Sequence, residues 1–166
     1  LQSIEIMDYI PMRYDRYTLA NDLVRLANAI GNMRIEQFDG MLQISGGDIL
    51  MQYIPYADPN GPDPNLTIQN LGDEGLTIHG IRVGDTLASI RTKLEAKGFE
   101  ALKEEPGAYF NCGFVYRDGS IAIGTRIIGG RMQGYKMIQL DPEQYASVSS
   151  VDESSMESWR TMTQPK

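Results

Sequence analysis

Residues 33–54 read MRIEQFDGMLQISGGDILMQYI. Three apolar runs in this stretch are separated by Asp39-Gly40 and by Gly46-Gly47. Asp-Gly and Gly-Gly between apolar runs are typical of tight hairpin turns, because such turns need positive φ and glycine adopts positive φ without steric cost. The stretch therefore predicts an antiparallel meander of three strands.

The second half of the chain repeats this order. An amphipathic pattern over 86–97 precedes apolar runs that are separated by Asp118-Gly119 and by Gly129-Gly130. In the first half, a similar helical pattern over 18–30 precedes the quoted stretch, with leucines at 19, 23 and 26. These patterns predict an α+β fold of two tandem αβββ units, whose helices pack on antiparallel meander sheets, either separate or merged into one.

Changes in composition suggest the domain organisation. We expect a first αβββ unit over 1–54, a connector over 55–65 with four prolines, and a second αβββ unit over 66–141. Residues 142–166 are polar and rich in serine, as disordered tails are. Met156, Trp159 and Met162 are spaced three apart within this tail, so a segment that folds on a partner is the alternative.

The charge balance excludes some classes of partner. The net charge is −7, with 22 acidic against 15 basic residues, whereas nucleic acid is bound through Lys and Arg that neutralise phosphates. No apolar run approaches the roughly 18 residues of a membrane span. We therefore expect neither a nucleic-acid partner nor a membrane span.

Few residues offer recognisable chemistry. The single cysteine, Cys112, excludes an internal disulfide and a multi-thiolate metal site, and its alternation with apolar residues predicts a buried thiol. His79 is the only histidine, so a Cys-His or Ser-His arrangement would have to use it. Asp58, Asn60 and Asp63 could supply oxygen ligands, but their spacing does not match a calcium-binding loop. The sequence predicts no metal and no cofactor.

The stretch GIRVGDTLASIRTKL, residues 80–94, combines a strand, a glycine, a polar cap and an amphipathic helix. Through it, residues 80–98 resemble the module shared by β-lactamase inhibitor protein and small bacterial outer-membrane-assembly lipoproteins. The resemblance implies a non-catalytic, protein-binding role in the bacterial cell envelope or outside the cell. It assigns the start of the helix to Gly84, Asp85 and Thr86 and transfers no binding residue.

We interpret the chain as a non-catalytic protein- or peptide-binding module that acts through an exposed sheet face or an edge strand. Aromatic residues and methionine are favoured at interfaces, so the candidate binding residues are Tyr109, Met132, Tyr135 and Met137. Their alternative role is to fill the core. Two other functions stay open: a small enzyme with a carboxylate- or Cys112-based site between the halves, and a structural component of a larger assembly.

The location of the protein is a further expectation. The sequence begins at Leu1 rather than methionine, so we expect a signal peptide, an anchor, another domain or a tag upstream, and Met7 as the natural start is the alternative. With the targeting segment removed, the expected location is the cell envelope or the extracellular space.

Overall fold

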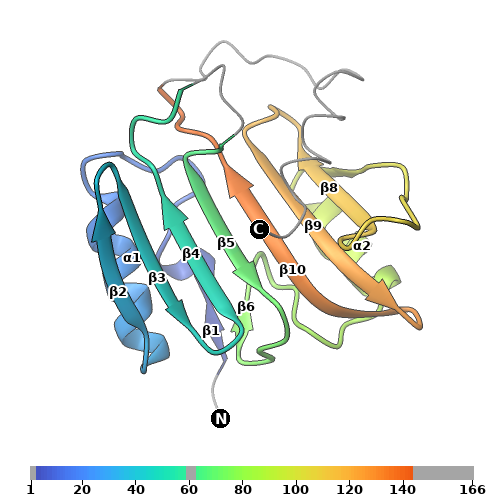
Figure 1. Cartoon of the computed structure of the whole chain (residues 1–166). Coiled ribbons are helices and arrows are strands. Elements are labelled where there is room, and N and C mark those ends of the chain that lie inside the picture. Colours follow the sequence, from blue (N-terminus) through green and yellow to red (C-terminus); the bar gives the residue numbers. More distant parts are fainter. Residues whose placement is uncertain (1–2, 59–62, 144–166) are drawn as a thin grey trace.

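Eight strands form one antiparallel sheet in the computed structural model, which describes residues 3–58 and 63–143 (Figure 1). The strand order is β2-β3-β4-β5-β10-β9-β8-β7, so the sheet runs outward from the central pair β5 and β10 to edges at β2 and β7. The strands are β2 (Arg34–Phe38), β3 (Met41–Gly46), β4 (Ile49–Tyr53), β5 (Leu66–Asn70), β7 (Phe99–Ala101), β8 (Cys112–Tyr116), β9 (Ile121–Ile128) and β10 (Arg131–Gln139).

The structure confirms a mixed α+β fold, with two α-helices and a large antiparallel sheet among the described residues. Each helix is followed by four strands of the shared sheet, where the sequence predicts three. The connector over 55–65 joins β4 to β5, which are neighbours in the sheet. The proposed domain division stays a prediction, and its polar tail lies outside the described residues from 144 onward.

The predicted hairpins are confirmed. Two-residue turns separate β2 from β3, β3 from β4 and β9 from β10, and a longer turn that contains Asp118-Gly119 separates β8 from β9. Gly129 and Gly130 both have positive φ, 61° and 76°, as a type I′ turn requires. The turn between β3 and β4 is Gly47-Asp48 rather than the expected Gly46-Gly47, because Gly46 is the last residue of β3.

The two helices form where the sequence predicts them. Helix α1 (Leu19–Ile30) ends at Gly31, and α2 (Leu87–Ala96) begins after Thr86, whose side-chain oxygen accepts a hydrogen bond from Ser89 N at 3.2 Å. Thr18 occupies the matching position before α1 but makes no capping bond through its side chain. Neither described helix has the length and apolar character needed to cross a bilayer.

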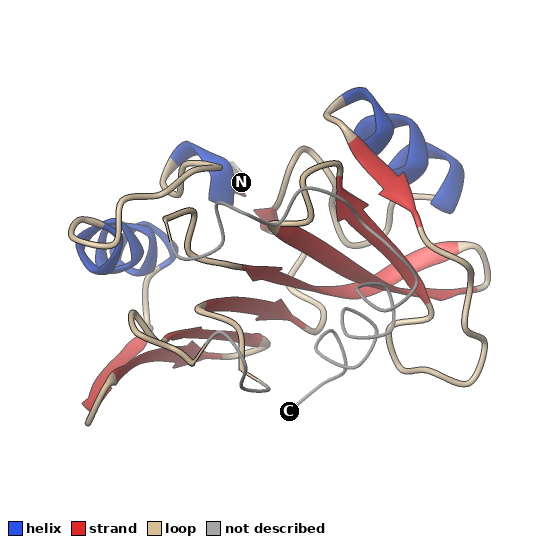
Figure 2. Ribbon diagram, turned by 90° about the horizontal axis from the view of Figure 1, so that it is seen from above, coloured by secondary structure: helices blue, strands red, loops and turns tan. Residues whose placement is uncertain are grey.

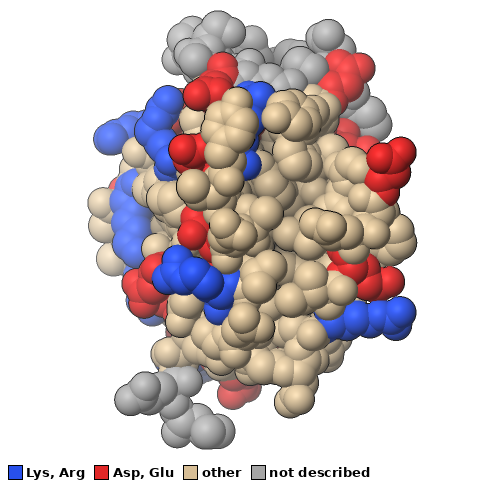
Figure 3. Space-filling view, turned by 90° about the vertical axis from the view of Figure 1, so that its left-hand side faces the viewer, with Lys and Arg blue, Asp and Glu red and all other residues tan. Residues whose placement is uncertain are grey.

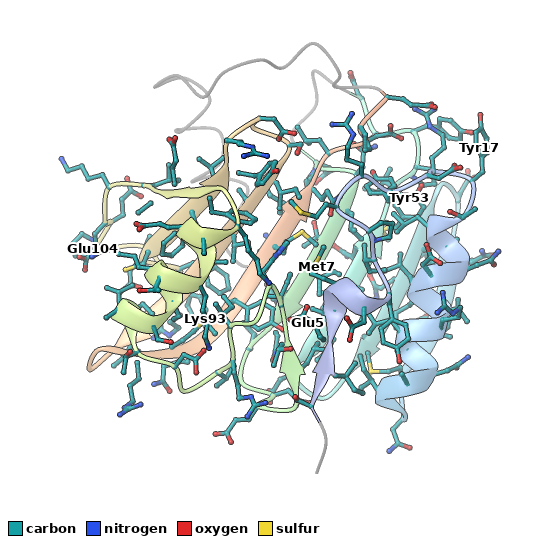
Figure 4. The ribbon with its side chains drawn as sticks, turned by 180° about the vertical axis from the view of Figure 1, so that it is seen from behind. Glu5, Met7, Tyr17, Tyr53, Lys93 and Glu104 are labelled. Carbon is teal, nitrogen blue, oxygen red and sulfur yellow. The ribbon has the colours of Figure 1, made fainter. Side chains whose placement is uncertain are left out.

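Both helices lie on one side of the sheet, which we call the helix-bearing face (Figure 2). A short parallel pair, β1 (Ile4–Glu5) with β6 (Leu76–Thr77), lies between them, together with the 3-10 helix η1 (Ile6–Asp8) that follows β1 (Figure 4). Buried residues of both helices, of this layer and of the sheet belong to one apolar cluster. The core therefore spans both halves of the chain.

Strand register explains why this core is continuous. Residues that face one another across six neighbouring strands point to the helix-bearing face, and all six are apolar and buried. This row consists of Ile44, Met51, Ile68, Met137, Ile123 and Phe114. Since side chains alternate along a strand, the residues next to this row point to the opposite side, which we call the helix-free face.

Candidate binding face

The helix-free face carries a row of polar and small residues across its centre, beside a small buried apolar cluster of Val115, Ala122, Ile138 and Leu140. The register places Gln69 beside Lys136, and Lys136 beside Gly124 on the next strand. This row continues to Leu50 on β4 and to Gly113 on β8. The same strands that are apolar toward the helices thus present an amide, an ammonium and two glycines toward the other side.

A neighbouring row adds a second amide pair. The side chain of Gln52 donates a hydrogen bond from Nε2 to Oε1 of Gln43 at 3.0 Å, across β4 and β3. The Oε1 atoms of Gln52 and Gln69 are buried and accept no hydrogen bond from any described residue. A buried acceptor without a donor is costly, so the two oxygens are polar positions enclosed within this face.

Lys136 is the most enclosed charged residue of this face, with 1% of its surface exposed. A buried ammonium group needs a polar partner, and Lys136 does take part in a polar contact in the structure. Its neighbours Gln69 and Thr67 are also buried. Thr67, Gln69 and Lys136 therefore form a buried polar group on the two central strands.

Tyr109 lies where the loop before β8 reaches β9. The guanidinium carbon of Arg126 is 4.1 Å from the centre of its ring, and Arg126 Nη1 donates to the Tyr109 carbonyl at 3.2 Å. The Asn111 side chain fastens the loop to β9, because it accepts from Ile127 N and donates to Ile127 O, both at 2.8 Å. Tyr109 is half-buried in this arrangement and is held in place by a cation–π contact.

The other three predicted binding residues lie in the core. Met132 and Tyr135 have no exposed surface, and Met137 is 1% exposed. The Tyr135 hydroxyl donates to Leu76 O at 2.9 Å, and burial raises its pKa above the usual range. The structure thus corrects the expectation that these side chains are displayed on the outer face, because they point toward the helices.

The environment of His79 is structural. Glu5 lies between the two helices (Figure 4), and its carboxylate accepts hydrogen bonds from Met7 N, His79 N, Gly80 N and the Thr77 hydroxyl, at 2.8 to 3.2 Å. The His79 ring packs edge-on against an aromatic ring, and burial lowers the pKa of His79 to about 4. The imidazole is therefore neutral at pH 7 and belongs to the packing of the β1–β6 layer.

Cys112 is buried, as the sequence predicts. Burial raises the pKa of its thiol, and the nearby carboxylate of Glu104 raises it further. A catalytic thiol needs the opposite shift, because the thiolate is the nucleophile. The surroundings of Cys112 favour an unreactive side chain.

An ion pair that sequence reasoning missed anchors the end of β10. Arg16 Nε lies 3.0 Å from the Asp141 carboxylate, and Tyr53 donates its hydroxyl hydrogen to Arg16 O at 3.1 Å. Burial and the charge of Asp141 raise the pKa of Tyr53 to about 12. The two residues of the ion pair lie far apart in the sequence, and no local pattern signals their contact.

A pocket of about 280 Å³ opens between the segment before α1 and the β8–β9 turn. It is lined by Met12, Arg13, Tyr116, Arg117, Asp118, Ser120 and Ile121. Arg13 lies 3.9 Å from Asp118, and the guanidinium of Arg117 lies over the ring of Tyr116. Within residues 3–58 and 63–143, no cluster of three His, Cys, Asp or Glu side chains could hold a metal ion.

No protein-family model, curated protein or solved structure matches this chain. Function is therefore inferred from the residues themselves.

Proposed function

We propose that this protein is a non-catalytic protein- or peptide-binding module whose recognition surface is the helix-free face of the sheet. One observation carries the proposal: none of the described helices covers this face, although it spans the same strands as the core. On β3 and β4 this face remains partly accessible, since Gln43, Leu50 and Gln52 are half-buried. An accessible sheet surface is available to a partner.

The composition of the face supports this proposal. On β3 and β4 the half-buried Gln43 and Gln52 present a hydrogen-bonded pair of amides. Toward its periphery, the apolar side chains of Phe38 and Ile128 are each 50% exposed. Apolar anchors around hydrogen-bonding groups provide both affinity and specificity in protein recognition.

The arrangement of the two halves is consistent with a duplicated binding module. Each half runs from a helix through four antiparallel strands, and the last strands, β5 and β10, pair at the centre. We include in the proposal that the halves are tandem copies of one helix-plus-meander unit. Such a duplication doubles the width of the recognition surface without a second core.

A cellular setting completes the proposal. The resemblance of residues 80–98 supports a bacterial protein of the cell envelope or of the extracellular space. A small enzyme is less well supported, because the raised pKa of Cys112 disfavours the thiolate and the lowered pKa of His79 makes its imidazole a weak base.

The experiment is site-specific photo-crosslinking. A photoreactive amino acid replaces Gln43 on the helix-free face in one variant and Arg25, an exposed residue of α1, in a matched variant. We expect one defined protein or peptide to be captured only from position 43, and Phe38→Ala to weaken binding of that purified partner by about tenfold. Capture from position 25 alone would show that the helix-free face is not the recognition surface. If both variants instead crosslinked in full to the same stable complex, the protein would be a structural component of that complex.

A further inference from the structure

The edge strand β2 is open along its whole length. All five residues, Arg34–Phe38, are exposed or half-buried, including Ile35 at 43% exposure. Figure 3 views the molecule from this side and shows largely uncharged surface across its middle, interrupted by a few charged side chains. The opposite edge strand, β7, has only three residues. An edge strand that is long and uncovered is a template for pairing with another strand.

The register of the sheet determines which backbone groups β2 directs outward. Backbone hydrogen bonds join Ile54 N to Asn65 O (2.7 Å) and Leu71 N to Asp48 O (2.9 Å). The even-numbered residues of β4 therefore direct their backbone N–H and C=O groups toward β5. Because antiparallel ladders alternate, the even-numbered residues of β2 then bond to β3, and Ile35 and Gln37 direct their N–H and C=O groups to the free edge.

We propose that β2 pairs with β2 of a second copy of this chain, antiparallel and centred on Ile35, so that two sheets join into one. A symmetric antiparallel pair of β2 strands must join the outward-directed N–H and C=O groups of one copy to those of the other. Three registers do so, with the two-fold axis at Ile35, Glu36 or Gln37. Centring on Ile35 places Arg34 opposite Glu36 of the second copy, twice, and brings the two Ile35 side chains together.

The two other registers lack this complementarity. Centring on Glu36 places two carboxylates directly opposite each other, which is destabilising. Centring on Gln37 places Glu36 opposite Phe38. Charged residues commonly protect an edge strand from pairing, but here their alternating signs select one register instead.

The charges at this edge are available to a second copy. Within one chain, Arg34 Nε lies 3.3 Å from Glu36 Oε1, and the Arg34 side chain is 76% exposed. Such an exposed pair contributes little to the monomer, so exchanging it for pairs between copies costs little. Because each copy carries a net charge of −7, repulsion opposes the dimer, and we expect it to form more readily in about 0.15 M salt than in low salt.

The experiment is sedimentation equilibrium of the full chain with charge-reversal variants. We expect a dimer that dissociates in the micromolar to millimolar range, because the interface is small. Arg34→Glu and Glu36→Arg should each weaken dimerisation by about tenfold or more, and the double variant Arg34→Glu/Glu36→Arg should restore it. Arg25→Glu, which makes the same charge change as Arg34→Glu on exposed α1, should leave the dimer intact.

Disulfide trapping tests the register. Ile35→Cys should form an intermolecular disulfide, because facing hydrogen-bonded residues have Cα atoms about 5.5 Å apart. Gln37→Cys should not, because residue 37 faces residue 33 of the second copy. A chain that stays monomeric at millimolar concentration, or charge reversals without effect or without rescue, would overturn the proposal. Trapping through position 37 but not position 35 would overturn the register.

Discussion

The helix-bearing and helix-free faces are built from alternate residues of the same strands, yet they differ in kind. Toward the helices, facing residues such as Met51, Ile68 and Met137 are apolar and belong to one core. One residue further along, Gln69 faces Lys136. Since backbone and register are shared, the difference lies in the side chains. Gln69 and Lys136 are themselves buried, with 6% and 1% of their surface exposed, so their polar groups need partners, whereas the apolar row needs none.

The largest expected effect comes from truncating one aromatic side chain on each face. Tyr135→Ala should destabilise the protein by about 3–5 kcal/mol, because a fully buried ring and a buried hydrogen bond are lost. Phe38→Ala, on the helix-free face, should cost about 1 kcal/mol or less, since half of its surface is exposed. Urea unfolding measures both. Equal losses would show that the two faces are buried to the same extent.

The second prediction concerns the neutral histidine beneath the helices. The pKa of His79 is about 4 in the folded protein against 6.5 when unfolded, so the unfolded state takes up a proton first as the pH falls. Stability should therefore decrease by about 3 kcal/mol between pH 6.5 and pH 4 through this residue, and no further below pH 4. Above pH 6.5 the imidazole is neutral in both the folded and the unfolded state, so this part of the stability is fully retained there.

The matched variant is His79→Asn, because asparagine tolerates the positive φ of 50° at this position. Its free energy of unfolding should be lower throughout but should fall less steeply between pH 6.5 and pH 4 than that of the natural protein. Parallel curves for the two proteins would mean that the imidazole is protonated in the folded state.

The third prediction compares thiols on the two faces. In the variant Ile128→Cys, the introduced cysteine lies at an exposed position at the end of β9, and Cys112 remains buried. The raised pKa and the burial of Cys112 should make its alkylation near neutral pH at least about tenfold slower than that of the introduced thiol. Mass spectrometry of the two peptides follows both rates. If Cys112 were alkylated faster than the introduced thiol, the result would favour the enzyme interpretation.

The smallest effect is expected from the amide pair on the helix-free face. Gln43→Leu leaves the half-buried Gln52 Nε2 without its acceptor and should cost about 1 kcal/mol. The double variant Gln43→Leu/Gln52→Leu removes both partners and should stay within about 0.5 kcal/mol of the natural protein. A double-mutant cycle isolates the coupling energy. If the double variant lost the sum of both single losses, the hydrogen bond itself would not couple the two residues.

Local features of this fold were predictable from sequence, because each depends on neighbouring residues. The glycine turns and both helices depend on φ preferences and apolar periodicity within a few residues. The pairing of β5 with β10 and of β1 with β6 joins distant segments without a local signal. The number of strands that share a sheet therefore could not be read from the turns.

The faces of β10 could not be assigned from the sequence alone. A bulge between Met132 and Gly134 shifts the alternation along β10, so that Met132 and Tyr135 are both buried on the helix-bearing side. Nothing in the residue pattern marks that shift. A better signal for the helix-free face was present in the alternation of Gln43 and Gln52 with apolar neighbours, which typically marks the polar side of a strand.

The central pairing of β5 with β10 also governs how the chain must fold. Its partners, such as Asn70 and Tyr135, are separated by nearly the whole second half, so the central ladder can close only after that half has been synthesised. Contacts of such sequence separation slow folding, because loop closure precedes the gain from burial. Until β10 is available, β5 is an edge strand with one side unpaired. Nascent or truncated chains that end before residue 131 should therefore aggregate.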